Sequence, residues 1–197
     1  RGFLKSCGAQ SDSCPQFTDA LSEYARRHEH ATRELQPIEG VHAARLLVVR
    51  DHWINVGMGF IPGQVANIVQ FAMLTGLYVY FDNYGRYDWQ RYFTGYGGID
   101  LRWTAARQAV WATRFHATGV SHPLRIDVFQ DTTHRGDEDW EEHLSAALGN
   151  LSARWILVDG SATTVNWRRV LDPALRRAVA IQKAAAPSLP PALSPVE

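Results

Sequence analysis

The 197-residue sequence predicts an α/β fold: a Rossmann-like parallel sheet with flanking helices, preceded by a helical arm. Two observations support this prediction. Short, continuous apolar runs of strand length alternate with longer segments whose apolar residues recur at helical spacing. The apolar runs have no polar face, which is typical of parallel strands covered by helices on both sides. We therefore expect a sheet of four or five strands.

Composition divides the chain into three parts. Residues 1–36 are expected to form an irregular leader and the helical arm, and residues 37–186 the Rossmann-like domain. Residues 187–197 hold four prolines and are expected to be a Pro-rich tail or linker.

The helical arm is a polar segment that begins near Pro15, a residue tolerated in the first turn of a helix. Its apolar residues form only a narrow stripe, so we expect the helix on the surface or in a stem before the domain. We also expect His28 and His30 to be solvated, because the helix is polar. Gln36-Pro37 ends the helix, since the residue before a proline disfavours helical geometry.

The central segment follows a buried strand predicted over residues 43–50 and contains a G-x-G-x-x-x-G spacing. The apolar helix after the glycines is expected to end at Thr75-Gly76, because glycine adopts the left-handed conformation at little cost. Residues 77–81 are rich in β-formers and too short for a helix, so they predict a strand that Asp82 closes. This arrangement is half of a Rossmann-type unit.

The remaining domain continues the alternation of helices and strands. Thr104 is expected to cap the first of these helices, and Gly149 to end a later one. Near the C-terminus we expect two helices, since Asp172 is a good cap and Pro173 suits a first helical position. The predicted elements are a helix over 104–118, a strand over 124–129, a helix over 139–148, a strand over 154–158, and helices over 165–170 and 173–186.

Charge and cysteine content limit the classes of partner. Twenty basic residues balance twenty acidic ones, so nucleic acid and membrane surfaces are not expected partners. The apolar runs are far shorter than the roughly 20 residues that span a bilayer, so no direct membrane insertion is expected in this segment. Cys7 and Cys14 lack zinc-ligand spacing, so no metal is expected; a disulfide and two free thiols both remain open. Asn150 begins a glycosylation sequon whose use is also open.

The glycine spacing has three interpretations. A dinucleotide site would use Asp82 to bind a ribose, although the preceding strand ends too early and Pro62 removes a backbone N–H from the turn. A structural interpretation makes Gly57 and Gly59 a tight turn and lets Gly63 bring the helix close to the sheet. The third interpretation is a sugar-transfer site.

The third interpretation rests on a family resemblance. The segment V-G-M-G-F and the segment F-A-M-L-T-G-L-Y-V-Y-F-D, from Phe71 to Asp82, resemble the start of the catalytic domain in α1,2-, α1,6- and protein O-fucosyltransferases. The aromatic loop around Trp89 is similar to a "W…Y-F" segment of some members. The chain departs from the family where an asparagine is replaced by Phe60 and a basic residue by Leu77.

The resemblance implies a glycosyltransferase of the two-domain GT-B type, which moves fucose from GDP-fucose to a glycan or glycoprotein acceptor. GDP-fucose is then the donor substrate, and no cofactor is expected. The expected compartment is the Golgi or secretory lumen, or the cytoplasm if the resemblance fails. In this family a second domain carries an H-x-R-x-G-D segment that holds the donor diphosphate, and the nearest match here is the compressed His134-Arg135-Gly136-Asp137. We therefore expect the acceptor-side half, with the C-terminal donor domain missing, so activity of this chain alone is open.

The candidate site residues follow from these interpretations. Asp82 is a candidate base toward a sugar hydroxyl, and His134 and Arg135 are candidates for holding phosphate. The alternative role of Asp82 is that of a strand-end turn residue, and the alternative for His134 and Arg135 is a solvated loop. An NAD(P)-binding Rossmann domain and a non-catalytic carbohydrate-binding module are the alternative functions. The candidate binding residues are Gly57, Met58, Gly59, Phe60, Gly63, Gln64, Tyr84 and Trp89.

Overall fold

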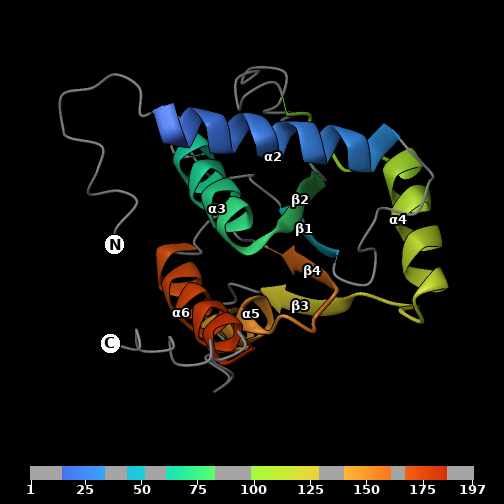
Figure 1. The fold of residues 1–197 in the computed structure, drawn as a ribbon. Coiled ribbons are helices and arrows are strands. Elements are labelled where there is room, and N and C mark those ends of the chain that lie inside the picture. The colour runs from blue at the N-terminus through green and yellow to red at the C-terminus, as the bar shows by residue number, and fades with distance from the viewer. Residues whose placement is uncertain are drawn as a thin grey trace, which may run out of the picture.

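The computed structural model describes residues 15–33, 44–51, 61–82, 99–128, 140–160 and 167–185. These residues form five helices and four strands that alternate after the first helix (Figure 1). In chain order the elements are α2 (Pro15–Arg33), β1 (Arg45–Asp51), α3 (Ile61–Thr75), β2 (Leu77–Asp82), α4 (Ala105–Ala117), β3 (Leu124–Val128), α5 (Trp140–Gly149), β4 (Trp155–Gly160) and α6 (Trp167–Ala185).

The four strands form one sheet in the order β2-β1-β4-β3, and every neighbouring pair is parallel. The predicted α/β fold with a Rossmann-like parallel sheet is therefore confirmed. β1 and β4 lie in the middle, and β2 and β3 form the two edges. Continuous apolar runs suit this arrangement, because a central parallel strand is covered on both faces.

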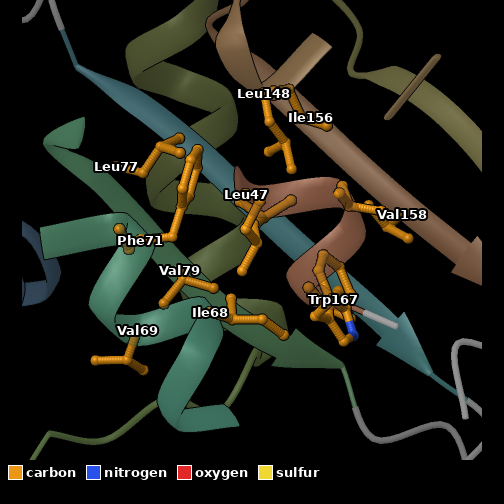
Figure 2. Close-up of a cluster of buried hydrophobic side chains, with 14 of the residues drawn as sticks. Leu47, Ile68, Val69, Phe71, Leu77, Val79, Leu148, Ile156, Val158 and Trp167 are labelled. Carbon is orange, nitrogen blue, oxygen red and sulfur yellow. The ribbon is translucent and has the colours of Figure 1, made fainter. Parts of the chain in front are cut away.

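The larger core lies between the sheet and helices α3, α5 and α6 (Figure 2). Alternate residues of the strands, such as Leu47, Val79 and Val158, meet Ile68 of α3 and Trp167 of α6 in this layer. All five side chains are fully buried. Burial of this apolar surface is the main stabilising contribution to the fold.

The second core lies on the opposite face, under α4. The intervening strand residues, including Val48 and Tyr80, pack there against Trp111 and Phe115 of α4. The sheet thus has a helical layer on each face, as parallel sheets require.

Helix α2 passes along the β2 edge of the sheet, from α3 at one end to α4 at the other (Figure 1). Tyr24 joins the larger core and Ala31 joins the core under α4. His28 lies between them on the same stripe, with only 2% of its surface exposed, so its expected solvation is wrong, whereas His30 is exposed as expected. The stripe at i, i+4 and i+7 faces the domain although most of the helix is polar. The helix is therefore part of the domain.

Helix α6 is a single helix, so the prediction of two helices separated at Asp172 is wrong. Pro173 lies inside it and removes one backbone hydrogen bond, a loss that commonly breaks a helix. The buried side chains continue at helical spacing across the proline, from Trp167 through Val170 to Ala174 and Ala178. Packing of this stripe on the sheet and on α5 offsets the local cost of the proline.

Three glycine and threonine positions test the predicted helix ends. Gly76 has φ of 69° directly after α3, and the Thr104 hydroxyl accepts a hydrogen bond from the backbone N–H of Arg107, so both predictions are confirmed. Gly149 instead belongs to α5 and lacks a left-handed φ. A Cβ at this position would lie 2.8 Å from the Cβ of Arg177, so the glycine serves the close crossing of α5 and α6.

Candidate functional site

The ends of the strands at their carboxyl termini are called here the carboxyl edge of the sheet. At this edge each of the four strands carries a charged residue in the same register. Arg50 of β1 is in register with Asp82 of β2 and with Asp159 of β4, and Asp159 is in register with Asp127 of β3. Residues in register across parallel strands point to the same face of the sheet, and Arg50 shares the face of Val48, which α4 covers. Together with Arg125 of β3, these residues are called the charged row.

Ion pairs link the members of the charged row into one network. Arg50 Nε lies 3.0 Å from Asp82 Oδ2, and Arg50 Nη1 lies 3.4 Å from Asp159 Oδ2. Arg125 Nη2 lies 2.9 Å from the same Asp159 oxygen, and Arg125 Nε lies 2.7 Å from Asp127 Oδ1. Three carboxylates face two guanidinium groups, so the row carries one excess negative charge.

The charged row is most sheltered around Arg50 and opens toward β3. The exposed fractions of the side chains of Asp82 and Asp159 are 18% and 12%, whereas those of Arg125 and Asp127 are 54% and 43%. Partial burial makes the Arg50 pairs stronger than those on an open surface. The carboxylates of Asp82 and Asp159 are therefore held in fixed orientations while part of each remains accessible.

The connections of the chain diverge at this point of the sheet. The helix after β1 is α3 and lies on one face, whereas the helix after β2 is α4 and lies on the other. Open α/β sheets bind their ligands outside the carboxyl ends of the strands where connections diverge in this way. Arg50 and Asp82 close these two strands, so they lie at the position where the fold favours a ligand site.

The first turn of α3 begins at the same edge, because this helix follows β1. Gly63 is exposed, and a Cβ on it would meet no atom within 4 Å among the described residues, so the idea that Gly63 lets the helix pack close to the sheet is wrong. Gln64 is half-buried, and its Oε1 is a buried acceptor without a hydrogen-bond partner in the part of the chain described here. An unpaired buried acceptor is costly and suits a ligand that donates a hydrogen bond.

Of the predicted site residues, the structure places Asp82, Gly63 and Gln64 at this edge. The others lie outside the described residues: Gly57, Met58, Gly59, Phe60, Tyr84, Trp89, His134 and Arg135. Cys7 and Cys14 lie outside them as well.

Four members of the charged row were not predicted from the sequence: Arg50, Arg125, Asp127 and Asp159. Asp159 lies just beyond the strand predicted over 154–158, whereas the structure includes it in β4. The available signal was a charged residue at the end of each apolar run. The order of the strands brings these residues into one row, and no local sequence pattern indicates that order.

The chemistry of the charged row favours hydrogen bonding to hydroxyl groups. Ionised carboxylates only accept hydrogen bonds, and those to charged groups are stronger than neutral ones. Within the described ranges no cluster of three or more metal-binding side chains is found. A ligand that presents several hydrogen-bond donors, such as hydroxyl groups, fits this chemistry.

No family model, curated protein or solved structure matches the chain. Among the helices that the structure describes, none is both long and apolar enough to span a bilayer.

Proposed function

We propose that the carboxyl edge of the sheet binds a sugar and that Asp82 accepts a hydrogen bond from one of its hydroxyls. The observation that carries this proposal is the orientation of Asp82 and Asp159 by one shared guanidinium, that of Arg50, at the point where the connections diverge. A sugar presents several hydroxyl donors at fixed spacing, and paired carboxylates are suitable acceptors for them. The unpaired Oε1 of Gln64 at the same edge supports this proposal.

The resemblance in sequence extends the proposal to sugar transfer. In a fucosyltransferase-like enzyme of GT-B type, this edge is the acceptor side of the cleft, and Asp82 is the candidate base that takes a proton from the acceptor hydroxyl. Its position at the end of β2 fits that role, because a catalytic base must lie within hydrogen-bond reach of the proton. GDP-fucose is the proposed donor and a glycan or glycoprotein the proposed acceptor.

A dinucleotide site is the second candidate function. Asp82 ends the strand that follows the glycine segment and its helix, where an acidic residue binds the ribose of NAD in Rossmann domains. The two candidates differ in the ligand that the same carboxylate binds. Titrating the protein with NAD⁺, NADP⁺, GDP-fucose and neutral oligosaccharides distinguishes them, and binding of a nicotinamide cofactor without any sugar binding would favour the second.

Replacing Asp82 with asparagine is expected to weaken sugar binding about 10- to 100-fold, the loss typical of a hydrogen bond to a charged group. Ligand-observed NMR titration of galactose- and N-acetylglucosamine-terminated oligosaccharides measures this change. The matched control is Asp172→Asn, which removes an exposed carboxylate on α6 outside the charged row and leaves affinity unchanged. Equal affinities for both variants and the unmodified protein would contradict the assignment of Asp82.

A further inference from the structure

The two edges of the sheet differ in whether another part of the chain covers them. On the β2 edge, the N–H of Phe81 donates to Leu101 O at 2.7 Å and the N–H of Trp103 donates to Phe81 O at 2.8 Å. On the same edge, His28 Nε2 of α2 lies 2.9 Å from Val79 O. The Asp100 carboxylate, paired with Arg102 and Arg107, anchors this covering segment. The β2 edge is therefore already occupied.

The β3 edge has no such cover in the part of the chain that the structure describes. β3 pairs only with β4, and no described segment makes a backbone hydrogen bond to its outer side. Leu124 is 50% exposed, an unusual exposure for a large apolar residue of a parallel strand. Unpaired edge strands are ready templates for another strand, and this one lies at the far end of the sheet from β2 (Figure 1).

The sequence of β3 is complementary to itself in an antiparallel alignment. Its five residues are Leu-Arg-Ile-Asp-Val. When two copies are aligned about Ile126, each Arg125 lies opposite Asp127 of the second copy and each Leu124 lies opposite Val128. Opposite charges directly across an antiparallel pair are stabilising, whereas like charges are destabilising.

Alternative symmetric registers are worse for the same residues. Side chains that lie directly opposite each other must point to the same face of the sheet. A two-fold axis perpendicular to the sheet therefore places one residue of the strand opposite the same residue of the second copy. Centring the axis on Arg125 places two guanidinium groups opposite each other, and centring it on Asp127 places two carboxylates opposite each other. Only the axis through Ile126 pairs all five residues and opposes unlike charges.

We propose that the chain forms a two-fold dimer through antiparallel pairing of β3 with β3 of a second copy, which joins the two sheets into one of eight strands. The occupant is a second copy because the strand matches itself in charge and in apolar residues. The covered β2 edge stops growth at two copies, since the described residues of each chain leave one sheet edge open. This inference does not depend on which ligand the carboxyl edge binds, although Arg125 and Asp127 belong to both the charged row and the strand pair.

Sedimentation velocity over a protein dilution series tests the proposal. The unmodified chain is expected to shift with concentration from the 22.1 kDa monomer to a species of twice that mass. Leu124→Lys is expected to weaken association at least tenfold, because it places a charged ammonium group against Val128 of the second copy at each end of the strand pair. The matched control is Leu74→Lys on α3, where the leucine is 48% exposed but lies away from the β3 edge.

A charge-swap pair gives a second test that does not depend on Leu124. Arg125→Asp and Asp127→Arg are each expected to be monomeric, because like charges then face each other across the axis. An equal mixture of the two variants is expected to form a heterodimer, since every carboxylate again faces a guanidinium. Circular dichroism establishes that each variant is folded. A monomeric unmodified chain at every concentration, an association of Leu124→Lys as strong as that of the unmodified chain, or a mixture that stays monomeric would overturn the proposal.

Discussion

Replacing Arg45 with methionine is expected to lower the free energy of unfolding by about 3–5 kcal/mol, among the largest effects of any single substitution in this chain. The guanidinium of Arg45 is buried and donates to three backbone carbonyls after the end of α5 and in its last turn: Leu148 O at 2.9 Å, Asn150 O at 2.9 Å and Ala153 O at 3.0 Å. Methionine preserves most of the volume but leaves these acceptors without their donor. Urea denaturation followed by tryptophan fluorescence measures the loss.

The size of this effect depends on the shape of the guanidinium as well as on its charge. Burial lowers the pKa of Arg45 to about 10, so the guanidinium remains protonated at neutral pH. A cation at the C-terminus of a helix is favourable. Arg45→Lys keeps the charge but cannot bridge three carbonyls with a planar fork, so we expect an intermediate loss. Arg169→Met, at an exposed position of α6, is the control and is expected to change stability by less than about 0.5 kcal/mol. Equal stabilities of Arg45→Met and Arg169→Met would contradict the assigned role.

Lowering the pH from 7 to 5 is expected to destabilise the fold by about 2 kcal/mol through His28 alone. Its Nε2 faces Val79 O at 2.9 Å and must carry the proton of that hydrogen bond, since a carbonyl only accepts. The pKa of His28 is lowered from 6.5 to about 4, chiefly by burial and also by the charge of Arg107, although the Val79 carbonyl and the Asp100 carboxylate oppose the shift. Denaturation curves at several pH values measure the effect.

The loss of stability at low pH follows from the direction of the pKa shift of His28. The folded chain binds this proton more weakly than the unfolded chain, so stability is fully present above pH 6.5 and is lost as the pH falls toward 4. His28→Gln keeps a side-chain donor but does not titrate, so its stability should depend less on pH over this range. His143→Gln on α5 removes an exposed histidine and should retain the dependence of the unmodified chain. Identical pH profiles for His28→Gln and the unmodified chain would refute this role of His28.

Local sequence signals predicted the elements whose conformation depends mainly on neighbouring residues in the chain. The apolar runs of β1 and β2, the left-handed Gly76 and the Thr104 cap were all predicted and are all present, because each depends on neighbouring residues in the chain. Pro173 shows where such signals fail. A proline with a good cap before it indicates a helix start, but burial of residues on both sides keeps α6 continuous.

The candidate site was only partly predictable because it depends on strand order. Asp82 could be selected from the sequence as the residue that closes a strand. Its partner Arg50 lies 32 residues earlier and Asp159 lies 77 residues later, and only the order β2-β1-β4-β3 brings both to the same level. His28 was misjudged for a similar reason, since its polar neighbours in α2 do not indicate which stripe of the helix faces β2.

Strand β1 carries an arginine near each end, and the two have different surroundings. Arg45 at the amino end is buried and bonds backbone carbonyls, whereas Arg50 at the carboxyl end is 30% exposed and bonds the carboxylates of Asp82 and Asp159. Backbone carbonyls held by Arg45 are satisfied internally. Among the described residues, Arg50 and Arg125 bind only the Oδ2 atoms of Asp82 and Asp159, which is why we propose ligand binding at the carboxyl edge.

Chemical-shift mapping with a sugar ligand tests this assignment most directly. The amides of the uniformly ¹⁵N-labelled chain are followed while an oligosaccharide is added to saturation. We expect the largest shifts at Arg50, Asp82, Asp159 and the first turn of α3, and we expect the same shifts to need about 10- to 100-fold more oligosaccharide in Asp82→Asn. Shifts concentrated away from the carboxyl edge, or shifts that appear at the same oligosaccharide concentration in Asp82→Asn, would contradict the proposed site.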